Sequence, residues 1–162
     1  MEFHTAIETP YREETLGVII EVAPLFMPEH SDAQESSFVY FYGVKMTNTR
    51  SEEVQLLERH WIIRDGKCDE RVVYGEGVVG QTPHLRPNES FKYHSYCPLK
   101  TSTGSMRGYY IFESATLGEF RVNVPLFFLR PQDKPGCGHG ELYNSRSMNL
   151  GVDSLGENVS EH

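Results

Sequence analysis

Residues 38–48 read FVYFYGVKMTN, and apolar side chains recur in this stretch at every second position. The members of one side of this alternation are Phe38, Tyr40, Tyr42, Val44 and Met46. Because successive side chains of a β-strand point to opposite faces, the pattern predicts a strand that buries one face and ends at Asn48.

The same period of two appears on both sides of this stretch. An alternation starts at Leu16 and includes Val18, Ile20 and Val22, and further β-favouring runs lie within 71–74, 91–95, 106–112 and 120–124. Residues that favour turns separate these runs. About seven short strands with turns between them predict an all-β fold of two packed sheets. The apolar runs 25–27 and 126–129 are expected in loops.

Residues 51–64 allow two interpretations. Ser51 could cap a helix, since the following apolar residues fall at helical spacing. Against this, residues 61–63 favour β-structure and lead into the Asp-Gly pair at 65–66, which is a hairpin signal. We therefore expect a strand.

Length and composition favour one globular domain with an extension. A chain of 162 residues suits a single core. We expect a domain over residues 1–130, whereas the Pro- and Gly-rich start of 131–162 and the polar residues after it predict a flexible tail.

The charge and the N-terminus limit the partners and the compartment. A net charge of −8 opposes direct binding to nucleic acid, which needs a basic surface. No apolar run is long enough for a membrane helix, and the acidic N-terminus does not resemble a secretory signal. The three cysteines are widely spaced and predict reduced thiols. We expect a cytoplasmic protein with no membrane association.

Four segments together resemble the ApaG family in order and spacing. They are VQLLERHW at 54–61, GEGVVG at 75–80, CPL at 97–99 and GSMRG at 104–108. The resemblance covers roughly residues 12–130. It implies a fibronectin type III-like (immunoglobulin-like) β-sandwich of about seven or more strands, and it favours a strand over a helix at 51–64.

The resemblance does not imply a catalytic mechanism. ApaG domains occur alone in bacteria, fused to an F-box in a ubiquitin-ligase substrate adaptor, and in a protein that partners DNA polymerase delta. The stand-alone bacterial form has been linked genetically to cobalt and magnesium handling. This sequence departs from the family pattern at Asn88, where a Pro-Gly turn usually has its glycine; Asn tolerates positive φ better than most residues.

The segment from Gly75 through Gly77 to Gly80 matches the letters of a dinucleotide-binding loop. Prolines follow it where that motif needs a long helix, so a Rossmann site is not expected. Loop amides can also form an anion-binding nest, to which Arg59 or Arg71 would add charge, although Glu76 opposes an anion there.

The tripeptide Arg59-His60-Trp61 joins a fork-shaped donor, a titratable ring and the single Trp. We expect Trp61 in the core, because a large aromatic residue gains most from burial. His60 has no evident nucleophile to activate, and we expect Cys97 to be a packed thiol. The sequence shows no paired zinc motif and no Gly-x-Ser-x-Gly elbow, so no catalytic residue, metal or cofactor is assigned.

These observations favour a non-catalytic binding module that recognises a protein partner through loops at one end of the sandwich. The candidate binding residues are Arg59, His60, Gly75, Glu76, Gly77 and Gly80. The alternative is a small-anion or nucleotide (pyrophosphate) binder connected with cobalt and magnesium homeostasis, which a basic pocket formed by Arg59, Arg71 or Arg107 would favour. Long edge strands make a homodimer a further expectation.

Overall fold

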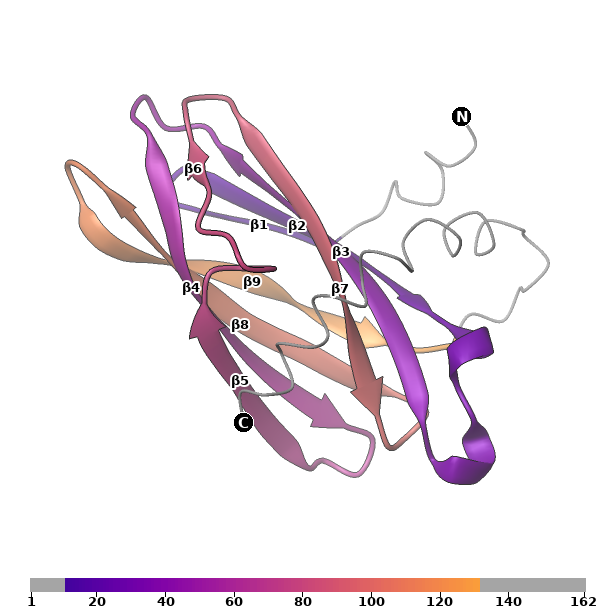
Figure 1. Cartoon of the computed structure of the whole chain (residues 1–162). Helices are drawn as coiled ribbons and strands as arrows, with labels where there is room; N and C mark the ends of the chain where they lie inside the picture. The colour runs from indigo at the N-terminus through magenta and orange to yellow at the C-terminus, as the bar shows by residue number, and fades with distance from the viewer. Residues whose placement is uncertain (1–10, 132–162) are drawn as a thin grey trace, which may run out of the picture.

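A computed structural model describes residues 11–131, and Figure 1 shows them as strands in two layers. The strands are β1 (Tyr11–Thr15), β2 (Val18–Phe26), β3 (Phe38–Asn48), β4 (Val54–Asp65), β5 (Glu70–Glu76), β6 (His84–Leu85), β7 (Ser90–Leu99), β8 (Gly104–Ser114) and β9 (Gly118–Leu129). Two short 3-10 helices, η1 (Pro28–His30) and η2 (Ala33–Glu35), lie between β2 and β3. No helix within the described range is long and apolar enough to cross a membrane. The predicted tail, apart from its first residue, lies outside the described residues.

The strands form two antiparallel sheets. The first, which we call the β3 sheet, has the order β1-β2-β3-β7. The second, the β4 sheet, has the order β5-β4-β8-β9, and β6 pairs with the end of β4 that β5 does not reach. The chain crosses between the sheets after β3, β6 and β7. This arrangement confirms the predicted all-β, fibronectin type III-like sandwich.

The core lies between the sheets and is rich in aromatic side chains. Trp61 is only 2% exposed, and its ring lies edge-on to Tyr42, Tyr110 and Phe127 at centroid distances of 5.6, 6.0 and 6.0 Å. Edge-to-face packing of this kind stabilises a pair beyond the area that it buries. The structure therefore puts Trp61 in the core, as expected.

β4 is a single strand, as expected, but it contains a β-bulge. Its pairing with β8 shifts register between Leu56 and Glu58, so Leu57 is an extra residue. An extra residue reverses the phase of the side-chain alternation. Leu56 is buried before the bulge, and Arg59 and Trp61 are buried after it. Val54 and Trp61 are seven residues apart, which suits a helix, and would lie on opposite faces of a regular strand. The extra residue of the bulge puts both on the buried face.

One predicted strand begins in the wrong place. Leu16 was expected inside a strand, but Leu16 and Gly17 form the turn between β1 and β2, with φ of +48° and +88°. The Leu16 side chain is exposed. Leu16 continues the apolar alternation of β2 only by coincidence. β1 has the sequence YREET, in which apolar residues do not alternate, so this strand could not be predicted.

The expectation that 25–27 and 126–129 are loops is largely wrong. Leu25 and Phe26 belong to β2, and residues 126–129 belong to β9. Pro24 suggested the end of β2, but the strand continues through it. β1 pairs only with residues 18–22, so at Pro24 β2 pairs with β3 alone. A missing N–H is tolerated where one side of a strand is free.

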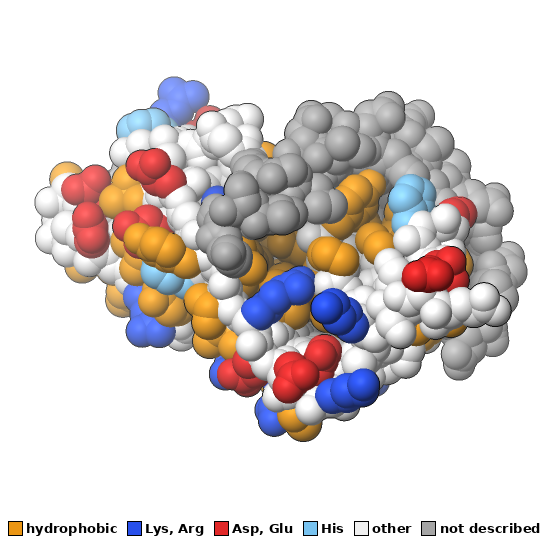
Figure 2. All heavy atoms as spheres, turned by 60° about the horizontal axis from the view of Figure 1, so that its bottom comes forward, with side chains coloured by type: hydrophobic (Ala, Val, Ile, Leu, Met, Phe, Trp, Pro, Cys, Tyr) orange, Lys and Arg blue, Asp and Glu red, His pale blue; other side chains and the backbone are white. Residues whose placement is uncertain are grey.

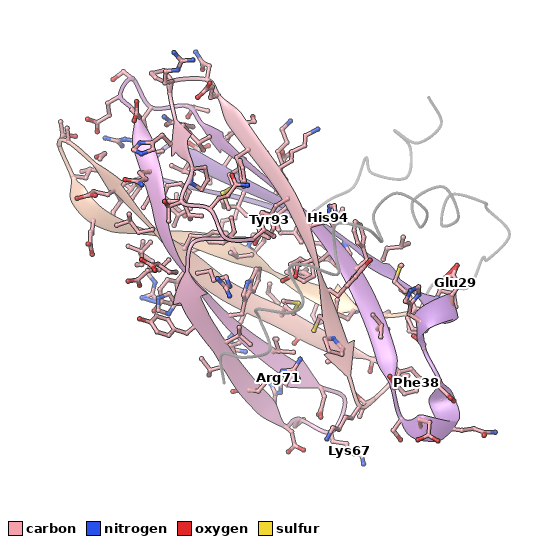
Figure 3. The ribbon with its side chains drawn as sticks, in the orientation of Figure 1. Glu29, Phe38, Lys67, Arg71, Tyr93 and His94 are labelled. Carbon is pink, nitrogen blue, oxygen red and sulfur yellow. The ribbon has the colours of Figure 1, made fainter. Side chains whose placement is uncertain are left out.

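The two lateral edges of the sandwich differ. On one side β1 is joined to β9, because the Asn123 N–H donates to Thr15 Oγ1 at 3.1 Å and the Phe128 N–H donates to the Tyr11 hydroxyl at 3.5 Å. On the other side β5 and β7 are the last strands of their sheets. There, Arg71 Nη2 donates across the sandwich to the Pro98 carbonyl at 2.9 Å (Figure 3).

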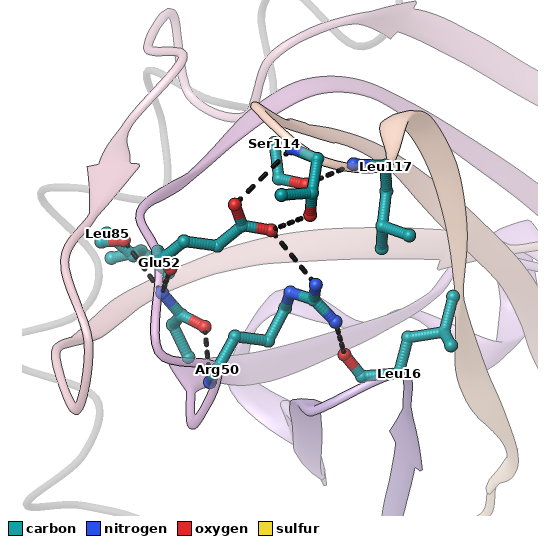
Figure 4. A network of polar contacts seen from close by, with 8 residues as sticks. Leu16, Arg50, Glu52, Leu85, Ser114 and Leu117 are labelled. Atoms are coloured by element: carbon teal, nitrogen blue, oxygen red, sulfur yellow. Dashed lines mark hydrogen bonds and ion pairs between the residues drawn. The ribbon is translucent and has the colours of Figure 1, made fainter.

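A polar network joins three turns at one end of the sandwich (Figure 4). Glu52, between β3 and β4, accepts hydrogen bonds from the Thr116 hydroxyl at 2.6 Å and from Arg50 Nη2 at 2.9 Å. Arg50 Nη1 also donates to the Leu16 carbonyl at 3.0 Å. The bond from Thr116 first, and that from Arg50 second, lower the pKa of Glu52 from 4.5 to about 2. The folded protein therefore stabilises the ionised carboxylate of Glu52 relative to the protonated carboxyl group.

We expect Glu52→Gln to destabilise the protein in a pH-dependent way. The folded-state pKa lies below the unfolded value, so the carboxylate contributes stability above pH 4.5 that is lost as the pH falls towards 2. Urea unfolding of wild type and variant should show a difference that is largest near neutral pH and shrinks on acidification. Glu119→Gln, on an exposed part of β9, is the control. A difference between wild type and Glu52→Gln that is equal at pH 7 and pH 3 would contradict this account.

Candidate functional site

The Arg59 side chain points into the sandwich and is bound by the glycine-rich segment. It is 7% exposed, and its Nη1 donates to the carbonyl oxygens of Glu76 at 3.2 Å and Gly77 at 2.9 Å. A Cβ atom at position 75 would lie 3.1 Å from the guanidinium. Gly75 thus lets the planar guanidinium approach β5 closely. The structure brings Arg59, Gly75, Glu76 and Gly77 together, with Arg59 and Gly77 buried and the Glu76 side chain exposed.

Buried tyrosines lie near this arginine. The hydroxyls of Tyr93 and Tyr110 are 2.7 Å apart, and Tyr42 lies in the same interior region. Burial raises the pKa of all three well above the usual range, and the positive charge of Arg59 only partly opposes that rise. These hydroxyls therefore stay protonated, and none is a ready base or nucleophile.

The amides of the glycine-rich loop are largely used within the fold. Val78 and Gln81 exchange two backbone hydrogen bonds of 2.9 Å, which close a tight turn whose central residues, Val79 and Gly80, have φ of +41° and +75°. The Gly77 N–H donates to the Leu57 carbonyl at 2.8 Å. An anion-binding nest needs amides that converge on a ligand. Here three loop amides have protein acceptors, so the geometry does not favour such a nest.

The three arginines considered for a basic pocket point to different places. Arg59 is buried beneath the glycine loop, and Arg71 reaches across to β7. Arg107 lies 3.4 Å from the Glu70 carboxylate. They do not form a shared pocket. The anion-binding alternative therefore gains no support from their arrangement.

His60 points to the opposite face of β4, away from the core. Its ring stacks on Tyr109 of β8, with centroids 4.4 Å apart and planes at 15°, and lies 4.6 Å from Tyr74 of β5. Nε2 is 3.1 Å from Glu58 Oε1. The Arg121 guanidinium lies 3.7 Å from the centre of the Tyr109 ring, a cation–π contact. Tyr74, His60 and Tyr109 are cross-strand neighbours and form an aromatic row across the outer face of the β4 sheet.

This outer face also carries most of the exposed large apolar side chains. Val72 is 61% exposed and Tyr74 54%, and both lie on β5. Leu126 and Phe128 are exposed on β9, where they alternate with buried neighbours. Among the described residues, the two remaining exposed large hydrophobics lie in turns, at Leu16 and Leu117. We refer to the row Tyr74, His60 and Tyr109, with Val72 and Arg121 beside it, as the outer patch.

The thiols and the acidic residues do not form a reactive centre in the described part of the chain. Cys97 is buried, and burial raises its pKa to about 11 even though Arg71 opposes the rise. A thiol of this kind is a poor nucleophile at neutral pH. Within residues 11–131, no group of three His, Cys, Asp or Glu side chains could hold a metal ion.

The fold separates some of the residues that were predicted to form one binding site. Arg59 and His60 are adjacent in the chain but lie on opposite faces of β4, and Gly80 lies at an exposed turn. Tyr109 and Arg121 were not among the predicted site residues, because their proximity to His60 depends on strand register. The only signal in the sequence was that β8 and β9 carry aromatic and basic residues at alternate positions.

The fold and the site define a fibronectin type III-like sandwich domain in which a glycine-rich loop holds a buried arginine. The chain belongs to the ApaG family, since the family model described as the ApaG domain matches residues 28–114. It is 43% identical over 123 residues to Protein ApaG of Bradyrhizobium sp. strain ORS 278, which covers 76% of this chain and 95% of that protein.

Solved structures agree with this assignment. A crystal structure from Bordetella pertussis, described as an ApaA protein, is 40% identical and has a TM-score of 0.70. The match covers 76% of this chain and 99% of that chain. A second solved structure, at 30% identity, has a TM-score of 0.67. The predicted family is therefore confirmed.

Replacing the buried arginine should cost much more stability than replacing an exposed one on the same strand. Arg59→Met leaves the Glu76 and Gly77 carbonyls without this donor, and we expect a loss of about 2–4 kcal/mol in the free energy of unfolding. Arg64→Met is the matched control, because Arg64 is exposed on β4; we expect a change within about 0.5 kcal/mol. Chemical denaturation measures both. Equal losses for the two variants would show that the buried hydrogen bonds do not stabilise the fold.

Two glycines of the loop offer a second matched pair. Both have positive φ, but a Cβ at Gly77 would lie 2.3 Å from the Gln81 carbonyl oxygen, whereas a Cβ at Gly80 would have no neighbour within 4 Å. Gly77→Ala should therefore cost about 1–3 kcal/mol more than Gly80→Ala in thermal or chemical unfolding. If Gly80→Ala is the more damaging change, the described loop geometry is incorrect.

Proposed function

We propose that this protein is a non-catalytic binding module that recognises another protein through the outer patch of the β4 sheet. The observation that carries the proposal is the aromatic row of Tyr74, His60 and Tyr109, with Arg121 stacked on Tyr109. Tyrosine and arginine are enriched among the residues that supply most of the binding energy in protein interfaces. A row of such residues on an open sheet face fits a protein partner better than a small molecule.

The outer patch is ordered before any partner binds. Its side chains come from strands, and Tyr109 is held between His60 on one side and Arg121 on the other. Side chains that are already fixed lose little conformational entropy on binding, which favours affinity. Val72 adds an exposed apolar surface next to the row.

The proposed surface differs from the one expected from sequence. His60 remains a contact residue, whereas Arg59 is buried and supports the sheet from within. Contacts from the sheet face replace contacts from the loops at one end of the sandwich. The glycine-rich loop then acts mainly by holding Arg59 through the carbonyls of Glu76 and Gly77.

The structure offers less to the other functions that we considered. An anion or pyrophosphate site would need free loop amides and converging arginines, and the loop amides of Gly77 and Val78 already have protein acceptors. A catalytic role would need an activated group, yet burial keeps Cys97 and the core tyrosines protonated. A cytoplasmic location agrees with the free thiols of Cys68 and Cys97.

Site-specific photocrosslinking tests the outer patch as a partner surface. A benzophenone side chain at position 72 should give a discrete adduct in an extract of the source cells, and unlabelled wild-type protein should compete for it. Tyr109→Ala protein should compete about 10-fold less well or worse, since loss of a central aromatic residue removes a large share of the binding energy.

A matched position controls for non-specific capture. Lys45 is exposed on the outer face of the β3 sheet, so a benzophenone there should not give the same adduct. Equal adducts from positions 45 and 72, or equal competition by wild type and Tyr109→Ala, would rule out the proposed surface.

A further inference from the structure

β5 is an edge strand next to the outer patch. Among residues 11–131 it pairs with β4 on one side and with no strand on the other. Natural edge strands are often blunted by proline, bulges, charged side chains or covering elements. β5 contains no proline, and its pairing with β4 is regular from Glu70 to Glu76. It does carry charged side chains, but that of Arg71 is directed towards β7 by its bond to the Pro98 carbonyl, which leaves the two glutamates at the ends of the strand. The free edge is therefore open to a segment whose charges complement these glutamates.

The backbone groups on that free edge can be identified. The Gly77 N–H donates to the Leu57 carbonyl, and an antiparallel ladder alternates between residues that face the partner strand and residues that face away. Because Gly77 faces β4, so do the N–H and C=O groups of Gly75 and Val73. The N–H and C=O groups of Tyr74 and Val72, which alternate with them, point away from β4. The side chains of the same two residues are largely exposed on the outer patch.

We propose that the partner binds by adding an extended segment to β5, and that this segment carries two apolar side chains at alternate positions between two basic residues. The inference rests on the proposed function and names the kind of partner. Backbone hydrogen bonds to Val72 and Tyr74 would supply affinity, and the alternate side chains would supply specificity.

The charges on β5 determine the flanking residues. Glu70, Val72, Tyr74 and Glu76 share one face of β5, and both glutamates are exposed. Glu70 also lies 3.4 Å from Arg107 on β8, an exposed ion pair that contributes little to stability and with which a lysine on an added strand can compete. Opposite charges on neighbouring strands stabilise pairing, whereas like charges oppose it. Figure 2 brings forward the end of the molecule at which β5 lies, and acidic, basic and hydrophobic side chains lie close together there. The net charge of −8 also favours a basic partner.

A second copy of the chain fits the edge less well. Two β5 strands paired around a two-fold axis at Val73 would set Glu70 against Glu76 on both sides. An axis at Val72 would instead set each Glu70 against Tyr74, which leaves both glutamates without an opposite charge. The acidic ends of β5 therefore favour a basic segment over self-pairing.

A synthetic peptide with the sequence TKTVTYTKT tests the inference, because its Lys, Val, Tyr and Lys side chains repeat the spacing of the four β5 residues. We expect saturable NMR shifts of the Val72 and Tyr74 amides in the labelled full chain. A peptide with Glu in place of both Lys should bind about fivefold more weakly or worse. N-methylation of the peptide's Val and Tyr amides should weaken binding about 10-fold or more, since the two hydrogen bonds that these N–H groups donate to the edge are lost.

A charge-swapped variant provides the matched control. The double variant E70K/E76K should prefer the Glu peptide over the Lys peptide, which a general loss of folding would not produce. No binding of the Lys peptide up to about 1 mM overturns the inference. So does an unchanged preference in the double variant, or sedimentation that shows the free protein to be a dimer together with slow amide exchange at Val72 and Tyr74.

The peptide experiment also separates this inference from the proposed function. If the N-methylated peptide binds as well as the parent, and Tyr109→Ala weakens both, then the partner uses the sheet face and not the edge. That result would overturn strand addition while supporting the outer patch. If Tyr109→Ala changes neither peptide binding nor the photocrosslinking competition, the outer patch itself is rejected.

Discussion

The hydrogen bonds from the Arg59 guanidinium to the carbonyl oxygens of Glu76 and Gly77 are the constraint on which the site depends. A charged group inside a sandwich core is costly unless polar partners surround it. The chain meets this requirement with three local features of the β4 sheet. The bulge at Leu57 turns Arg59 inward, Gly75 leaves room for the guanidinium, and Gly77 takes the positive φ that lets the loop fold over it.

The same bulge creates the outer surface. Because residues on a strand alternate, turning Arg59 inward turns His60 outward, into register with Tyr74 on β5 and Tyr109 on β8. The inserted residue Leu57 therefore has two results: Arg59 binds the glycine-rich loop from inside the core, and the aromatic row forms on the outer face. β5 takes part in both, since its Gly75 covers the arginine and its Tyr74 extends the row to the free edge of the sheet.

Features that depend on neighbouring residues in the chain could be predicted from sequence, whereas features that depend on contacts between distant strands could not. Alternation within a strand is local, and it predicted the β3 and β7 segments. The burial of Trp61 was predicted from the size of its aromatic side chain. Asn88 takes a φ of +70°, as expected for a residue in a glycine's place. Adjacent residues of a strand lie on opposite faces, so the expected burial of Trp61 already implied that Arg59 points inward and His60 outward. The bulge, which puts Leu56 and Arg59 on the same buried face, has no signature in the composition of the segment and could not be predicted. The contact of His60 with Tyr109 depends on the register of two strands that are distant in sequence, and local periodicity does not determine that register.

Native-state amide hydrogen exchange on the full chain tests the central claim most directly, because it reports the locked loop and the open edge of β5 in one measurement. We predict that the Gly77 amide, which donates to Leu57, exchanges as slowly as core amides of β4. The amides of Val72 and Tyr74 should exchange much faster than that of Val73, which faces β4. Fast exchange at Gly77 would contradict the arginine-held loop, and slow exchange at Val72 and Tyr74 would show that the edge is already paired.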